Sequence, residues 1–136
     1  MSKTCLMLVI RKEQIQEFIA TDDDQLAKVV AEAVRKANGE RVEGYDDAEL
    51  ERMVRLGFDR ARSHGLTGAE DIAAFVAVMF EVAPRFDEQE AIKQVLDDPS
   101  FPPSMRFYQI FDRAPGEAWN EAGRRYEDSF WFPDNK

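Results

Sequence analysis

The stretch Tyr45–Pro84, YDDAELERMVRLGFDRARSHGLTGAEDIAAFVAVMFEVAP, decides the fold. Its first half carries apolar side chains at three- and four-residue steps, the period of a helix with one buried face. These positions are Leu50, Met53, Val54, Gly57, Phe58 and Ala61. Every residue from Ile72 to Phe80 is apolar, and a helix that is apolar all round must be covered by neighbours on all sides. Fewer than about 18 apolar residues run together, so we do not expect a membrane span.

The corner between these two helices carries its own signals. Gly65 follows the last periodic position and can adopt the left-handed conformation that ends a helix, after which Leu66 packs back on the preceding turn. Thr67 is placed to cap the second helix, with Glu70 completing a capping box. Pro84 ends that helix. The corner therefore predicts an antiparallel helix pair.

The remaining chain also reads as helices. Residues 5–10 fit either a strand or a first helical turn, and a helix is expected at about 11–20. A further helix starts near Thr21 and ends at Asn38-Gly39. Later helices are a short one capped by Asp87, one that follows the Pro102-Pro103 pair, and one at about 117–126. We predict an all-α, single-domain bundle (1–136) of about five to seven helices around a central apolar helix at about 68–83.

Length and charge limit the classes of partner. A chain of 136 residues suits one domain. Eighteen Lys and Arg against 27 Asp and Glu give a formal charge of −9, which disfavours nucleic acid and anionic membranes as partners. A basic protein surface is compatible with this charge. Cys5 is the only cysteine, and the short apolar run Cys5–Ile10 ends at charged residues without a cleavage site, so we expect a reducing, cytoplasmic location.

Motifs for catalysis are not found in the sequence. His64 is the only histidine, and nothing in its spacing pairs it with Cys5, so we interpret it as a helix-end histidine. The cluster Asp22–Asp24 lacks the alternating ligands of a calcium loop and is explained as charge at a helix start. Glycine-rich phosphate loops, HExxH and GxSxG are also absent. We expect no enzyme activity, no cofactor and no metal site.

The C-terminal tail, 127–136, is unusually aromatic. Phe130, Trp131 and Phe132 are consecutive, whereas chain termini are usually polar. These rings either dock on the bundle and close its end, or anchor a partner, because aromatic residues dominate binding hot spots. On the second interpretation Arg124 and Arg125 lie at the rim. The candidate partner-binding residues are Trp119, Arg124, Arg125, Phe130, Trp131 and Phe132.

Three stretches carry a family resemblance: Arg11–Gln14, MVRLGFDRARSHGLTGAEDIAAFVAVMF (Met53–Phe80), and Phe86-Asp87 followed by VLDDPSFPPSMR (Val95–Arg106). They are similar to small bacterial proteins encoded beside type VI secretion genes, near PAAR-domain and effector proteins. The resemblance covers residues 11–112. Its family-like spacing is that of Gly57, Arg60, Ala61, Gly65, Asp71, Phe86 and Asp87. Ala83-Pro84 departs from the glycine that such proteins more often have before the Phe-Asp pair.

The resemblance implies a secretion-linked accessory protein whose partner is a secreted effector or the protein that loads it. It leaves two roles open: an adaptor or co-chaperone that loads an effector, and an immunity protein that binds and neutralises one. The matched features describe a scaffold, which favours the adaptor. The acidic composition suits an immunity protein that occludes a basic toxin site through shape and charge alone.

Overall fold

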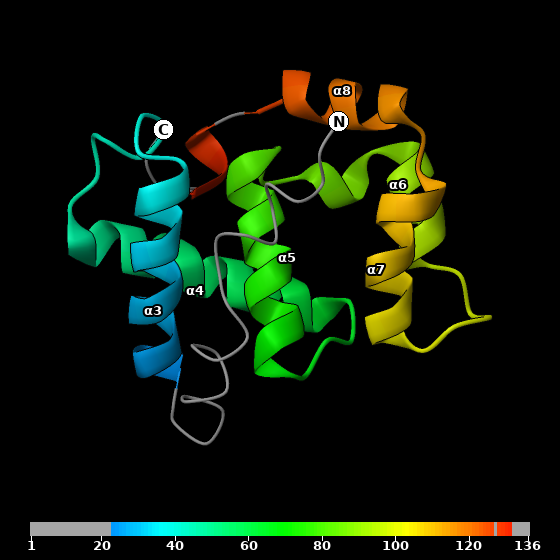
Figure 1. The fold of residues 1–136 in the computed structure, drawn as a ribbon, viewed down its shortest axis with the longest axis horizontal. Helices are drawn as coiled ribbons and strands as arrows, with labels where there is room; N and C mark the ends of the chain where they lie inside the picture. Colours follow the sequence, from blue (N-terminus) through cyan, green and yellow to red (C-terminus); the bar gives the residue numbers. More distant parts are fainter. Residues whose placement is uncertain (1–22, 127, 132–136) are drawn as a thin grey trace. The chain divides into compact units, whose positions relative to one another are not determined.

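The computed structural model describes residues 23–126 and 128–131, and their regular secondary structure is helical throughout (Figure 1). The described part of the chain contains no strand, which confirms the predicted all-α class. The elements are α3 (Asp23–Ala37), α4 (Asp47–Ser63), α5 (Ala69–Glu81), η1 (Phe86–Glu88), α6 (Glu90–Leu96), α7 (Pro103–Arg113), α8 (Gly116–Arg124) and η2 (Asp128–Trp131), where η denotes a 3-10 helix. The predictions for residues 5–10 and 11–20 and for Thr21 lie outside the described residues.

The chain divides into two compact units, Met1–Glu81 and Val82–Lys136. The first unit holds α3, α4 and α5, and the second holds η1, α6, α7, α8 and η2. The predicted single-domain arrangement of these elements stays a prediction.

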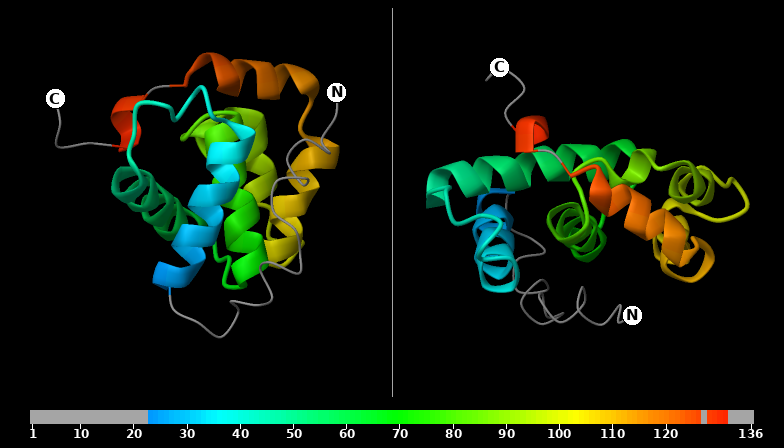
Figure 2. Two further views of the ribbon diagram at one scale, coloured as in Figure 1. Left: turned by 60° about the vertical axis from the view of Figure 1, so that its left-hand side comes forward. Right: turned by 90° about the horizontal axis from the view of Figure 1, so that it is seen from above.

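In the first unit, α4 contacts both α3 and α5, and α3 also contacts α5. Figure 2 shows α4 running across the other two helices, which lie side by side. The apolar side chains of α5 from Ile72 to Phe80 are buried, apart from Ala74, which is half-buried. The predicted central apolar helix is therefore present.

The contact between α4 and α5 is close at Gly57. A Cβ atom at this position would lie 2.7 Å from Cγ2 of Val76 and 3.3 Å from Sδ of Met79. Only glycine leaves room for this approach, because real Cβ contacts are not found below about 3 Å. Gly57 thus serves packing, on the helix face that the periodicity assigned to the core.

The end of α4 has the left-handed glycine that the sequence predicts, whereas the start of α5 differs from the prediction. Gly65 has a φ of 88°, and the N–H of Leu66 donates to the Ala61 carbonyl at 3.3 Å. Leu66 is buried. At the other side of the corner, the first helical hydrogen bond of α5 runs from Ile72 N–H to the Gly68 carbonyl. Helix α5 thus begins one residue later than a Thr67 cap would place it.

The start of α4 is fixed by a capping box. The Asp46 carboxylate accepts from the N–H of Glu49 at 2.8 Å, and the Glu49 carboxylate accepts from the N–H of Asp46 at 3.0 Å. Both groups satisfy N–H donors that the first helical turn would otherwise leave unpaired. Asp46 is accounted for by this role, and Asp47 pairs with Nη2 of Arg35 at 3.2 Å.

In the second unit, α6 contacts α7 and α8, while η1 contacts α6 and α8. The buried apolar side chains of these elements include Phe86, Ile92, Val95, Leu96, Phe107 and Ile110. The prediction that Asp87 caps α6 is wrong. Asp87 lies inside η1 and is buried, and the cap is Gln89, whose side chain accepts from the N–H of Ile92. The extra turn of η1 delays the start of α6 and moves the capping position beyond Asp87.

Candidate functional site

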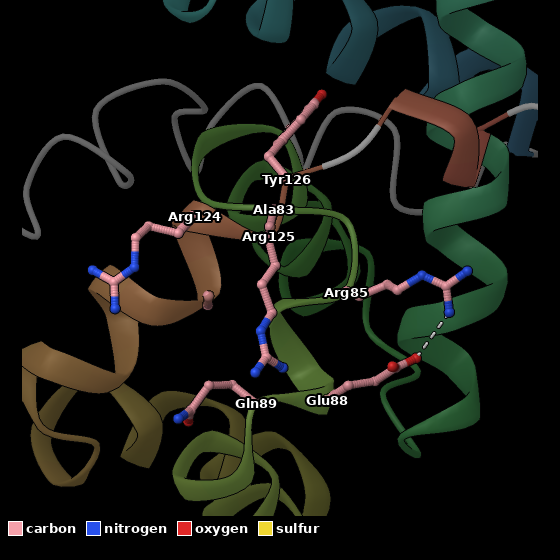
Figure 3. A pocket seen from close by; sticks show the side chains of 8 residues that line it. Ala83, Arg85, Glu88, Gln89, Arg124, Arg125 and Tyr126 are labelled. Atoms are coloured by element: carbon pink, nitrogen blue, oxygen red, sulfur yellow. Dashed lines mark hydrogen bonds and ion pairs between the residues drawn. The ribbon is translucent and has the colours of Figure 1, made fainter.

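A pocket of about 430 Å³ opens in the second unit between the η1–α6 junction and the C-terminal end of α8 (Figure 3). We call it the arginine pocket. It is lined by Ala83, Arg85, Glu88, Gln89, Ala122, Arg124, Arg125 and Tyr126. The lining carries three formal positive charges and one negative charge, in a chain whose formal charge is −9. The pocket is therefore locally basic on an acidic protein.

Gln89 joins the two walls of the arginine pocket. Its Oε1 accepts from the N–H of Ile92 at 3.0 Å, which caps α6, and its Nε2 donates to Oε1 of Glu121 in α8 at 2.7 Å. The side chain is buried, so both polar atoms need these partners. Because each end of the amide is committed to a different helix, Gln89 fixes the spacing of α6 and α8.

The three arginines differ in how they are held. Nη1 of Arg85 lies 3.4 Å from Oε2 of Glu88, the pair drawn dashed in Figure 3, and its guanidinium carbon lies 5.2 Å from the centroid of the Phe130 ring. Nη2 of Arg125 lies 3.2 Å from Oε2 of Glu121, one helical turn earlier. Arg85 is thus stacked on an aromatic ring, whereas Arg125 is held by an exposed pair of the kind that contributes little stability.

Arg124 is exposed and forms no hydrogen bond or ion pair with another residue in the ranges 23–126 and 128–131. In Figure 3 its guanidinium points away from that of Arg125, which reaches toward Gln89 and Glu88. An arginine presents five N–H donors, and these remain available at Arg124. The rim of the arginine pocket therefore carries a guanidinium with unused hydrogen-bonding capacity.

The structure brings three of the six predicted partner-binding residues together. Arg124 and Arg125 line the arginine pocket, and Phe130 contacts its Arg85 wall while staying partly exposed. Phe132 lies outside the described residues. The prediction that Arg124 and Arg125 flank an aromatic surface is thus compatible with the arrangement around Phe130.

The two tryptophans lie in structural positions. Trp131 is fully buried, and its indole N–H donates to the hydroxyl of Tyr126 at 3.3 Å. Trp119 is half-buried and stacks on Phe111, with ring centroids 5.6 Å apart and planes 7° apart, and on Phe86 at 6.3 Å. For Trp131 the burial agrees with the interpretation that the tail docks. Trp119 is not among the residues that line the arginine pocket.

Arg85, Gln89 and Tyr126 line the arginine pocket but were not predicted from the sequence. Gln89 and Glu121 are 32 residues apart, so no local pattern relates them. The sequence offers one weak indication that Gln89 caps α6. Gln89 follows the acidic Asp87-Glu88 pair and stands directly before the apolar helical period of α6. Gln ranks below Asp as a cap, so propensity favoured the wrong residue.

His64 lies at the end of α4, as predicted. Its backbone N–H donates to the carbonyl of Ala61 at 3.0 Å, and its ring centroid lies 5.4 Å from that of Phe75. In the acidic cluster, Asp24 forms an ion pair with Arg55. Both residues therefore have contacts that account for them without a reaction or a metal.

Neither a protein-family model, nor a curated protein, nor a solved structure matches this chain. Across the described ranges, His, Cys, Asp and Glu side chains do not gather into groups of three or more that could hold a metal ion. Within those same ranges the helices are too short or too polar to cross a bilayer.

Proposed function

We propose that this protein is a non-enzymatic accessory protein of a type VI secretion cluster that acts as an effector adaptor or co-chaperone by binding another protein. One observation carries the proposal: a pocket lined by three arginines lies beside the partly exposed Phe130 ring. Arginine and aromatic side chains are the residue types most enriched at the energetic centres of protein interfaces. The link to secretion comes from the family resemblance of residues 11–112.

The residue types in the arginine pocket favour binding over catalysis. Guanidinium groups keep their protons at any physiological pH and present several donors in a fixed plane, so they hold an anionic group without transferring protons to it. Gln89 has both side-chain polar atoms committed to the fold. The pocket therefore offers guanidinium donors on two segments whose spacing Gln89 holds, which suits recognition of an anionic group.

Deletion and tagging in the native host test the adaptor role. A tagged full-length chain is expected to co-purify with an effector or its loading protein, and deletion is expected to abolish export of that effector. Its toxicity inside the producing cell should not change. Normal export from the deletion strain would refute the adaptor role, whatever protein the tagged chain captures.

The formal charge of −9 favours one alternative, an immunity protein that covers the basic active site of a toxin. On that account, expressing this chain rescues sensitive cells from one toxin, and deletion makes the producer sensitive to it. The same deletion strain decides between the two roles, because an adaptor mutant loses export and an immunity mutant loses survival.

A further inference from the structure

The arginine pocket has a charge that differs in sign from that of the whole chain. Its lining has three arginines and the carboxylate of Glu88, and the carboxylate of Glu121 lies 3.2 Å from Arg125, so one formal positive charge remains in a chain whose formal charge is −9. A polyanion such as a nucleic acid is repelled by the net charge. A single carboxylate placed in the pocket experiences the nearby guanidinium groups more strongly, since charges farther away than about 10 Å are screened by salt.

Arg124 and Arg125 are adjacent at the end of α8, and because their guanidinium groups point apart in Figure 3, binding of one carboxylate by both requires rotation of their side chains. Arg124 has no hydrogen bond or ion pair with the rest of the described structure, and within that structure the guanidinium of Arg125 pairs with the half-buried Glu121 at 3.2 Å. Exchange of such a surface pair for another carboxylate costs little. When Arg125 turns away, Glu121 keeps its hydrogen bond from Gln89 at 2.7 Å, so the spacing of α6 and α8 is unchanged.

The volume of the pocket and the Phe130 ring that contacts Arg85 indicate the rest of the ligand. A volume of about 430 Å³ lies within the range of small-ligand sites, which is about 300–1,000 Å³, and holds a side chain or two rather than a folded surface. The ring of Phe130 remains half-exposed beside Arg85 and can pack against an apolar neighbour of the carboxylate. A glutamate or aspartate next to an apolar residue fits both features.

We propose that the arginine pocket binds an acidic peptide segment of the partner protein. One Glu or Asp carboxylate of that segment accepts hydrogen bonds from Arg124 and Arg125, and an adjacent apolar side chain packs on Phe130. This inference rests on the proposed function, because it names the chemistry by which the partner is recognised. Trp131 is fully buried, so its ring is not available to the peptide.

Arginine side-chain NMR of the full-length chain tests the proposal. The probes are the blocked hexapeptide Gly-Ser-Glu-Phe-Ser-Gly, its glutamine counterpart and inorganic phosphate. The glutamate peptide is expected to shift the Nε–H signals of Arg124 and Arg125 saturably, and the glutamine peptide is expected to bind about tenfold more weakly. The double variant R124Q/R125Q should bind the glutamate peptide about tenfold more weakly than the wild type does. The control R113Q, which removes an arginine of α7 outside the pocket, should bind it with wild-type affinity.

Several outcomes overturn the proposal. Equal binding of the two peptides removes the carboxylate from the recognition, and binding of phosphate with no binding of the glutamate peptide assigns the pocket to a phosphate-type anion. Unchanged peptide binding by R124Q/R125Q places the site elsewhere. These failures differ from failure of the adaptor role, because that role is tested separately, by whether deletion of the gene abolishes export of the effector. If export is lost on deletion but the double variant restores it fully, the adaptor role stands and the acidic segment does not.

Discussion

The side-chain amide of Gln89 donates a hydrogen bond of 2.7 Å to the carboxylate of Glu121, and this bond connects the start of α6 to α8 across 32 residues of sequence. The same amide accepts from the N–H of Ile92 at 3.0 Å. One buried side chain therefore both begins a helix and holds the opposite wall of the arginine pocket. The other carboxylate oxygen of Glu121 pairs with Nη2 of Arg125 at 3.2 Å.

Removal of this amide should therefore destabilise the second unit. For Q89A we expect a loss of about 1–3 kcal/mol in the free energy of unfolding, because the helix cap and a buried hydrogen bond disappear together. Chemical denaturation checks this. Q94A is the matched control, since Gln94 lies on the same helix and is exposed, and its stability should be close to that of the wild type. Equal stability of Q89A and Q94A would contradict the role assigned to Gln89.

The close approach at Gly57 gives a second prediction. Alanine in a helix is usually about 1 kcal/mol more favourable than glycine, but a Cβ here would lie 2.7 Å from Cγ2 of Val76. We expect G57A to lower the free energy of unfolding by about 1–2 kcal/mol because of this overpacking.

The control for G57A is G123A, where a Cβ would meet its nearest atom at 3.9 Å, an ordinary contact. This variant should match or exceed wild-type stability. In a V76A background the alanine at position 57 should no longer destabilise, because the methyl group that it meets is gone. If G57A is equally harmful with and without Val76, the clash is not the cause.

Asp98 gives a prediction about pH. Its carboxylate accepts from the backbone N–H of Ser100 at 2.9 Å and from Nη1 of Arg113 at 3.1 Å, and these bonds hold the pKa of Asp98 below the usual value of 3.8. Because the folded pKa is lowered, Asp98 contributes stability above pH 3.8 and loses that contribution as the pH falls through the folded value.

Thermal unfolding of wild type and D98N at a series of pH values tests this. The wild type should be more stable at neutral pH, and the difference between the two proteins should stay constant down to about pH 5 and then narrow as the acid is added. A difference that does not change between neutral pH and the acid limit would show that the bonds to Ser100 and Arg113 do not favour the ionised carboxyl.

Two neighbouring aromatic residues of the tail differ in burial, since Trp131 is fully buried and Phe130 is half-exposed. Trp131 is fully buried, so W131A should cost about 3–5 kcal/mol of folding stability. Phe130 is half-exposed, so F130A should cost less and should instead weaken peptide binding in the arginine pocket. Denaturation and peptide titration of both variants give the two readouts. A stable W131A variant with reduced binding would move the tryptophan from the core to the interface.

Much of the first unit could be predicted because its signals are local. The apolar period of α4, the uninterrupted run in α5 and the left-handed Gly65 each act within a few residues of the position that shows them. The close packing at Gly57 was on the predicted face, but its cause, contact with Val76, requires two helices to be placed first. Local sequence thus indicates which face is buried and leaves open what covers it.

The arginine pocket could be predicted only in part, because its two walls come from distant segments. Arg124 and Arg125 were identified from their position beside the aromatic tail, whereas Arg85 and Gln89 belong to a turn about 35 residues earlier whose 3-10 geometry displaced the expected cap. The buried position of Trp131 was one of two alternatives, since three consecutive aromatic residues suit either a core or an interface.

The most direct test of the central claim is calorimetric titration of the captured secretion partner into the full-length wild type, R124Q/R125Q and R113Q. If the arginine pocket binds this protein's partner, the double variant raises the dissociation constant about tenfold or more, while R113Q binds as the wild type does. Equal dissociation constants for all three proteins would contradict the claim that this pocket is the binding site.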